Sequence, residues 1–223
     1  MELGKRLGKT AIVAGVCHGF IANRSLTPYL REAEFLLEEG ATPQEVDKAL
    51  TDFGMAMGPF AVRDLAGLDI GWAMRKATAH ERDPAKRYSR IGDVICERGW
   101  FGQKSGRGFY RYQPGSRTPV ADPEVEEIIR RCAREAGFEA RPQQPGDIVA
   151  RCLLAVVNEG ARELAEGIAQ RASDFDLAWI NGFGFPRWRG GPLHWASRSG
   201  LDKVAGTIGG YSLSNDYWEV APL

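Results

Sequence analysis

Apolar residues recur at helical spacing from the first quarter of the chain onward. Within residues 20–39 they fall three or four positions apart on one broad stripe, formed by Ile21, Leu26, Tyr29, Leu30, Ala33, Leu36 and Leu37. This spacing predicts an amphipathic helix from Phe20 to Glu39. Gly40 supplies a C-terminal stop, and Pro28 is expected to kink the helix.

Polar residues mark the starts of the later helices. Thr42 is followed by Pro43 and, three positions on, by Glu45, which is the pattern of a capping box with proline at the first helical position. This helix is predicted to reach Phe53. Asp122 is expected to cap a helix that ends at Gly137, and Ser173–Asp176 resembles another capping box. Further helices are expected over 57–66, 69–80, 88–98, 148–166 and from Pro192.

Four segments interrupt the helical pattern. The β-branched run at 10–16 predicts one short strand or an extended lead-in, and residues 101–112, FGQKSGRGFYRY, read as a structured loop with a short strand-like end. Residues 114–119 are predicted to be a linker, and 182–191 are rich in glycine and aromatic residues. Many helices with almost no strand indicate the all-α class.

The chain contains an ordered internal repeat. Residues 21–24 resemble 148–151, LLEEG at 36–40 matches ELAEG at 163–167, residues 46–49 match 175–178, and Gly58-Pro59 matches Gly191-Pro192. Either helices with glycine stops merely look alike, or a helical domain has been duplicated. The duplication predicts tandem related domains over 1–115 and 120–223. We expect them to pair internally about a pseudo-twofold axis, with the long helices from Phe20 and Ile148 equivalent.

Composition narrows the function classes. Lysine plus arginine equals aspartate plus glutamate at 29 each, and the arginines are dispersed, which argues against nucleic-acid binding. No apolar run has the length of a membrane span or a signal peptide, so a soluble cytoplasmic protein is expected. The cysteines occur singly, and the histidines lack metal spacing, so we expect no metal site.

Three motifs, in this order and spacing, resemble the 3-hydroxyacyl-CoA dehydrogenase family of fatty-acid β-oxidation. They are CHGFIANRSLTPYLREA at 17–33, MAMGPFAVRDLAGLDIG at 55–71 and FGQKSGRGFYRY at 101–112. Together with the repeat, the resemblance covers nearly the whole chain. The duplicated arrangement is similar to that of bacterial multifunctional α-subunits and peroxisomal bifunctional enzymes. It implies two helical domains of the 6-phosphogluconate-dehydrogenase C-terminal type.

The resemblance also implies what the chain lacks. The family reaction oxidises a 3-hydroxyacyl-CoA to a 3-ketoacyl-CoA with NAD, using a Rossmann domain and a catalytic histidine in the family's N-terminal half. No Gly-x-Gly-x-x-Gly fingerprint opens this chain, and His18, His80 and His194 do not match the catalytic histidine's context. We therefore expect the chain alone to be inactive, with NAD bound mainly by a Rossmann domain in the full-length enzyme or another chain. Its substrate would be an acyl-CoA.

The motifs assign expected roles to particular residues. Asn23 matches the family's active-site asparagine, which would donate to the developing carbonyl oxygen or fix the thioester, although asparagine also serves as a helix cap. Lys104 matches a lysine that reaches the cofactor, or is a solvated loop lysine. The segment Met57-Gly58-Pro59 is expected to shape the acyl pocket, or only to start a helix.

The second copy departs from the first at two informative positions. Ala150 replaces Asn23, which suggests that only the first copy carries chemistry. Asn181 aligns with a position that touches substrate in the multifunctional enzymes, where tyrosine can stand. Arg24 and Arg151 occur in both copies and are expected to form structural salt bridges. The alternative function is a non-catalytic helical interaction module that keeps the fold and has lost the reaction.

Overall fold

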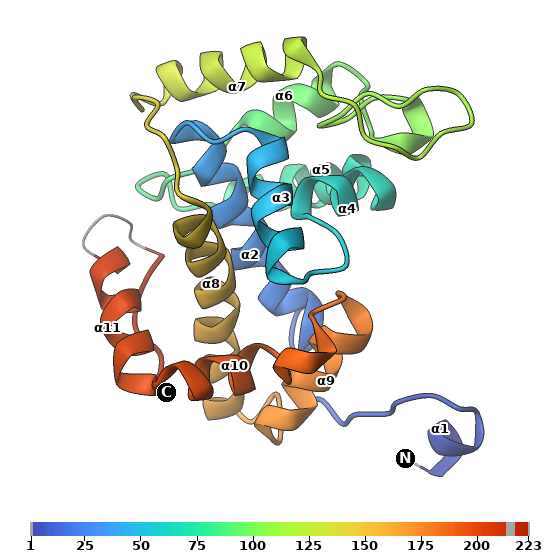
Figure 1. Ribbon diagram of the computed structural model, residues 1–223, viewed down its shortest axis with the longest axis vertical. Coiled ribbons are helices and arrows are strands. Elements are labelled where there is room, and N and C mark those ends of the chain that lie inside the picture. The colour runs from blue at the N-terminus through green and yellow to red at the C-terminus, as the bar shows by residue number, and fades with distance from the viewer. Residues whose placement is uncertain (1, 213–216, 223) are drawn as a thin grey trace. The chain divides into compact units, whose positions relative to one another are not determined.

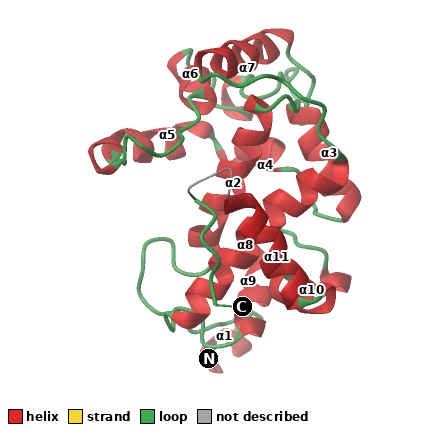
Figure 2. Ribbon diagram, turned by 90° about the vertical axis from the view of Figure 1, so that its left-hand side faces the viewer, coloured by secondary structure: helices red, strands yellow, loops and turns green. Residues whose placement is uncertain are grey.

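The computed structural model describes residues 2–212 and 217–222, and within them the regular structure is helical (Figures 1 and 2). None of the helices described is long and apolar enough to cross a membrane. The α-helices are α1 (Glu2–Arg6), α2 (Ala22–Glu38), α3 (Pro43–Phe53), α4 (Pro59–Ala66), α5 (Leu68–Ala77), α6 (Ile91–Glu97), α7 (Pro123–Glu135), α8 (Pro145–Ala165), α9 (Ala172–Gly182), α10 (Pro192–Ser199) and α11 (Leu201–Ser212). Single 3₁₀ turns span Ala79–Glu81, Gln103–Ser105 and Arg187–Arg189.

The predicted cap of α3 is confirmed in detail. The hydroxyl of Thr42 accepts a hydrogen bond from the amide of Glu45 at 3.2 Å, and the Glu45 carboxylate accepts one from the Thr42 amide at 2.8 Å. Gly54 ends the helix with φ 119°, a left-handed conformation that glycine adopts without steric cost. Asp122 likewise caps α7 as expected.

Of the two alternatives for residues 10–16, the structure excludes the strand and leaves the extended lead-in, and the capping box predicted at Ser173–Asp176 is wrong. Residues 10–16 form no strand, because their pairing is limited to one bridge between Ala14 and Ala169, in which the Gly15 amide donates to the Ile168 carbonyl at 2.8 Å. A strand needs a longer neighbour to pair with. Helix α9 begins before Ser173 without a side-chain cap bond, and the carboxylate of Asp174 is bonded to Arg171 at 3.0 Å instead.

The chain forms two compact units, Met1–Tyr29 with Cys152–Leu223, and Leu30–Arg151. We call them the outer unit and the inner unit, after their places in the sequence. The borders between the units lie within α2 and α8, so each unit contains part of both long helices. Completely buried aromatic side chains form both cores, Phe175, Trp179 and Phe185 in the outer unit and Phe35, Phe60 and Phe109 in the inner one. The division into domains at 115–120 stays a prediction.

The repeat recurs as a repeated connection between helices. The carboxylate of Asp47, on α3, accepts hydrogen bonds from two amides in the first turn of α4, both at 2.9 Å. Asp176, on α9, does the same for α10 at 2.8 and 3.2 Å. A β-carbon at Gly58 or at Gly191 would lie 2.3 Å from an atom of that aspartate side chain. The repeated Gly-Pro pairs therefore start helices whose amides a buried carboxylate caps.

The arginine of the first copy is paired with acids of the second. In the outer unit, Nε of Arg24 lies 2.7 Å from Oε1 of Glu159, and its Nη1 lies 2.5 Å from Oε2 of Glu166. These side chains connect the first turns of α2 with the last turns of α8. The salt bridge expected for Arg24 is confirmed.

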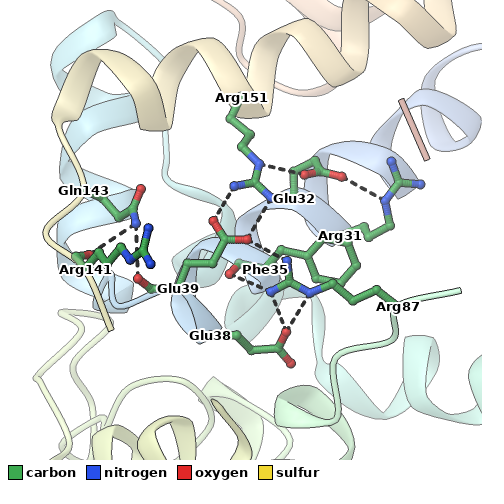
Figure 3. A network of polar contacts seen from close by, with 9 residues as sticks. All are labelled: Arg31, Glu32, Phe35, Glu38, Glu39, Arg87, Arg141, Gln143 and Arg151. Atoms are coloured by element: carbon green, nitrogen blue, oxygen red, sulfur yellow. Dashed lines mark hydrogen bonds and ion pairs between the residues drawn. The ribbon is translucent and has the colours of Figure 1, made fainter. Parts of the chain in front are cut away.

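The arginine of the second copy forms the reciprocal set in the inner unit (Figure 3). Nε of Arg151 lies 2.9 Å from Oε2 of Glu32, and both of its terminal nitrogens are bonded to Glu39. Arg87 joins the same cluster through Glu39 and Glu38. Arg151 lies 127 positions after Arg24, and Glu32 and Glu39 lie 127 positions before Glu159 and Glu166. The matching pairs support the duplication independently of the sequence alignment.

Candidate functional site

Asn23 lies in the first turn of α2, and its side chain faces solvent. Among the described residues, no group forms a hydrogen bond with its side-chain amide. The helix already begins at Ala22, so the structure does not place Asn23 at the capping position. Just before it, Phe20 has φ 53° with 57% of its surface exposed, a conformation that costs energy for a residue with a β-carbon. The start of α2 therefore combines a strained residue just before the helix, Phe20, with the exposed amide of Asn23.

Trp179 fixes the same end of α2. Its indole nitrogen donates to the Ser25 hydroxyl at 2.9 Å, and its ring meets Tyr29 edge-on with centroids 5.7 Å apart. Trp179 is completely buried on α9. Asn23 lies two positions before Ser25 on α2, and side chains two positions apart on a helix differ by about 200° in direction. Asn23 therefore points away from the face that Trp179 covers. The outer unit thus holds Asn23 on a fixed support with its amide open.

Asn181 lies one half-turn beyond Trp179 and is also exposed. Its amide nitrogen donates to the carbonyl of Leu177 at 3.0 Å, and its amide oxygen accepts from Arg187 at 3.0 Å. Both halves of the amide are therefore engaged within the outer unit. The residue orients Arg187 in this structure.

Lys104 forms an ion pair with Asp69, at the first turn of α5, with a nitrogen–oxygen distance of 2.5 Å. The hydrogen bond from Lys104 lowers the pKa of Asp69. About half of the lysine side chain stays exposed, at 51%. Gly67 has φ 98°, a conformation that favours glycine, and a β-carbon there would lie 3.0 Å from the Lys104 ammonium, so this flexible side chain would have to shift.

The glycine-rich loop around Lys104 is closed onto a buried carboxylate. Asp64 accepts hydrogen bonds from the amides of Phe109 and Tyr110 at 2.9 and 3.0 Å and from the Tyr112 hydroxyl at 3.0 Å. Burial raises the pKa of Asp64 to about 6. A β-carbon at Gly108 would lie 2.1 Å from this carboxylate. Gly108 therefore serves close packing against Asp64.

A cleft of about 370 Å³ lies in the inner unit beside the α3–α4 connection. Met57 and Gly58 line it, whereas the structure buries Pro59 in the first turn of α4. At its wall, the hydroxyl of Tyr110 donates to Asp47 at 2.8 Å, and burial raises the pKa of Asp47 to about 6. The other lining residues are Gln44, Lys48, Thr51, Ala56, Ala61, Gln103, Tyr112, Arg117 and Pro119.

The expected site residues are divided between the two units. Asn23 and Asn181 belong to the outer unit, and Met57, Gly58, Pro59 and Lys104 belong to the inner unit. Sequence reasoning missed the structural carboxylates Asp47, Asp64 and Asp176. The repeated aspartate followed by Gly-Pro was the signal that pointed to two of them. No group of three or more potential metal ligands occurs within residues 2–212 and 217–222.

Comparisons with known proteins agree with the motifs. The 3-hydroxyacyl-CoA dehydrogenase C-terminal domain model matches residues 19–112. The chain is 46% identical over 216 residues to the peroxisomal bifunctional enzyme of Danio rerio, covering 92% of this chain and 30% of that protein. For the Homo sapiens enzyme the identity is 41%, covering 96% and 31%. The glyoxysomal fatty acid beta-oxidation multifunctional protein MFP-a of Brassica napus is 39% identical, covering 90% and 28%. The chain thus spans about a third of these relatives' length.

Solved structures show the same fold. The dehydrogenase part of multifunctional enzyme 1 from C. elegans superposes with a TM-score of 0.76 at 30% identity, covering 99% of this chain and 50% of that one. The 3-hydroxybutyryl-CoA dehydrogenase of Escherichia coli gives the same TM-score at 21% identity, covering 99% and 61%, and supports the fold alone. Residues 19–112 are therefore similar to the 3-hydroxyacyl-CoA dehydrogenase C-terminal domain, and the whole chain is similar to the C. elegans dehydrogenase part.

Proposed function

We propose that this chain is the substrate-side helical part of an NAD-dependent 3-hydroxyacyl-CoA dehydrogenase of fatty-acid β-oxidation. The observation that carries the proposal is Asn23, an exposed amide within the matched domain that has no hydrogen-bond partner among the described residues and lies on a turn anchored by Trp179. The name of the Brassica napus relative mentions fatty-acid β-oxidation, and the C. elegans protein is named as a dehydrogenase part.

The Asn23 amide is suited to an electrostatic role. Oxidation of a 3-hydroxyacyl-CoA removes the hydroxyl proton to a base and the hydride from C3 to NAD, and it leaves a carbonyl oxygen. A fixed N–H donor aimed at that oxygen, or at the thioester oxygen, stabilises the charge that develops there. Within the inner unit, Met57 and Gly58 line the cleft beside the α3–α4 connection, and their contact with the acyl chain stays a prediction.

The chain's own residues fit NAD poorly. The sequence contains no Gly-x-Gly-x-x-Gly fingerprint, and Lys104, the one expected cofactor contact, has about half of its side chain exposed. We therefore propose that a Rossmann domain, in the same polypeptide or another chain, binds NAD and supplies the base. On this proposal the described chain alone is inactive. The sequence prediction of a cytoplasmic location is untested, and several relatives are named as peroxisomal or glyoxysomal.

The test joins the chain to the NAD-binding half of the Danio rerio relative and measures oxidation of a 3-hydroxyacyl-CoA. Asn23→Ala is expected to lower kcat/KM on the order of 100-fold, as loss of one preorganised donor does. Its free energy of unfolding should change by less than about 0.5 kcal/mol, because the side chain is exposed. Ala150→Asn, at the matched position of the second copy, is the control and should not change the rate.

A rate that is unchanged in Asn23→Ala would contradict this role, and absence of all turnover in the joined protein would favour the non-catalytic interaction module instead. Asn181→Ala distinguishes a substrate contact from a support for Arg187. If Asn181 contacts the substrate directly, Asn181→Ala should raise KM and leave kcat unchanged. Asn181→Gln should then restore KM, because it keeps the amide.

A further inference from the structure

The second copy carries a longer connection between its capped helices than the first. Residues 183–191 join α9 to α10, whereas residues 54–58 join the equivalent α3 to α4. The shorter loop reads Gly-Met-Ala-Met-Gly, and the longer one contains Pro-Arg-Trp-Arg. The copy that has Ala150 in place of Asn23 therefore carries two arginines and a tryptophan at this connection.

The longer loop is held in one conformation at both ends. The Phe183 ring packs on Trp179 with centroids 5.1 Å apart, and Phe185 is buried. At the other end Gly190 and Gly191 have φ 80° and 106°, and a β-carbon on Gly190 would lie 2.4 Å from the His194 ring. The 3₁₀ turn Arg187–Arg189 is thus presented by packed neighbours.

The tip of this turn is aromatic and cationic. Trp188 is 73% exposed, although large aromatic side chains are usually highly buried. The Arg189 guanidinium lies over one face of its ring, 4.0 Å from the centroid. Arg187 is exposed and fixed by its bond to Asn181.

The surrounding sequence favours an anionic ligand. Residues 181–200 contain three arginines and no aspartate or glutamate. The nearest carboxylate in the repeated connection is Asp176, which is buried and bonded to the first amides of α10. Residues 181–200 therefore contribute no acidic side chain of their own to this turn.

We propose that Arg187, Trp188 and Arg189 bind the phosphorylated adenosine end of a coenzyme A thioester. The indole would stack on the adenine ring, and the guanidinium groups would contact its phosphates, for which arginine is suited. This inference rests on the proposed function for the substrate class. A nucleic acid fits less well, because the chain has equal numbers of acidic and basic residues and this turn is a single small basic patch.

Calorimetry on the purified chain tests the inference without any turnover. CoA and adenosine 3′,5′-bisphosphate should bind with similar affinity, and pantetheine, which lacks the nucleotide, should bind at least ~10-fold more weakly. Trp188→Ala should weaken CoA binding ~10-fold, as loss of one stacking platform does, and Trp188→Phe should recover most of it. Arg187→Ala should weaken CoA but not pantetheine.

Two matched controls separate this turn from the rest of the molecule. Arg198→Ala removes the third arginine of residues 181–200, which lies outside the 3₁₀ turn, and should leave nucleotide affinity unchanged. CoA should also protect the exposed indole from acrylamide quenching in the native chain, and this protection should vanish in Trp188→Ala, because the other tryptophans are less exposed.

The inference is overturned if the Trp188 and Arg187 variants bind CoA as the native chain does, if pantetheine binds as tightly as CoA, or if CoA does not bind at all. These outcomes are independent of the dehydrogenase test. Turnover that depends on Asn23 but not on Trp188 would reject this site and keep the function. Trp188-dependent CoA binding without turnover in the joined protein would do the reverse.

Discussion

Glu163 is a buried acid at a position where the other copy is apolar. Its side chain is 0% exposed on α8, and among the described residues neither carboxylate oxygen has a hydrogen-bond partner. The repeat aligns it with Leu36, which is also buried. Burial raises the pKa of Glu163 from 4.5 to about 8, and the neighbouring Glu159 and Glu166 add to this while Arg24 opposes it.

The raised pKa gives a definite sign for the dependence of stability on pH. The folded state holds the proton of Glu163 more tightly than the unfolded state does. The contribution of this proton to the free energy of unfolding is therefore fully present below pH 4.5 and is lost as the pH rises through about 8. At ~1.4 kcal/mol for each pKa unit, the loss is on the order of 3–5 kcal/mol across that window. The charged form is the costly one, because nothing replaces its hydration.

Glu163→Leu should remove this loss. Urea unfolding followed by circular dichroism, repeated between pH 5 and pH 9, should show that the variant exceeds the native chain in free energy of unfolding by ~1 kcal/mol at pH 5 and by several kcal/mol at pH 9. Leu36→Glu is the mirror control and should introduce a new loss toward high pH. Parallel curves for the native chain and Glu163→Leu would refute the reasoning.

Other predictions concern the structural carboxylates and the cofactor. Asp47→Ala should lower the free energy of unfolding by about 3 kcal/mol in urea melts, because two amides of α4 and the Tyr110 hydroxyl lose their acceptor. Gly108→Ala should cost about 1–3 kcal/mol in the same assay, because its β-carbon would overlap Asp64. Calorimetry should detect no micromolar binding of NAD to the purified chain. In the joined enzyme, Lys104→Ala should raise KM for NAD several-fold with little change in kcat.

Local signals in the sequence were sufficient for much of the helical framework. The Thr42–Glu45 box involves only neighbouring residues, so its spacing determines its geometry, and the structure confirms it. The β-branched run at 10–16 shows the limit of such signals. A strand depends on a partner far away in the chain, and here that partner is a single residue after α8.

The buried carboxylates could not be recognised from spacing alone. Asp64 is bonded to amides 45 and 46 positions away, a contact that no helical periodicity encodes. Glu163 was visible in the repeat as an acid opposite a leucine, but its burial became evident only once α8 was placed against its neighbours. The roles of Asn23, Met57 and Lys104 come from a family resemblance and stay predictions, because the type of a side chain does not by itself identify the molecule that it binds.

The exchanged arginines make the two copies mutually dependent. A cut in the linker at 114–119 would give one fragment with Arg24, Glu32 and Glu39, and another with the counterpart arginine and acids. Each fragment would contain one arginine and two acidic residues, but the ion-pair partners of these residues would all be on the other fragment. On the predicted division at 115–120, neither half would contain a partner for its own arginine, so we expect the two halves to be suited to split-protein reassembly.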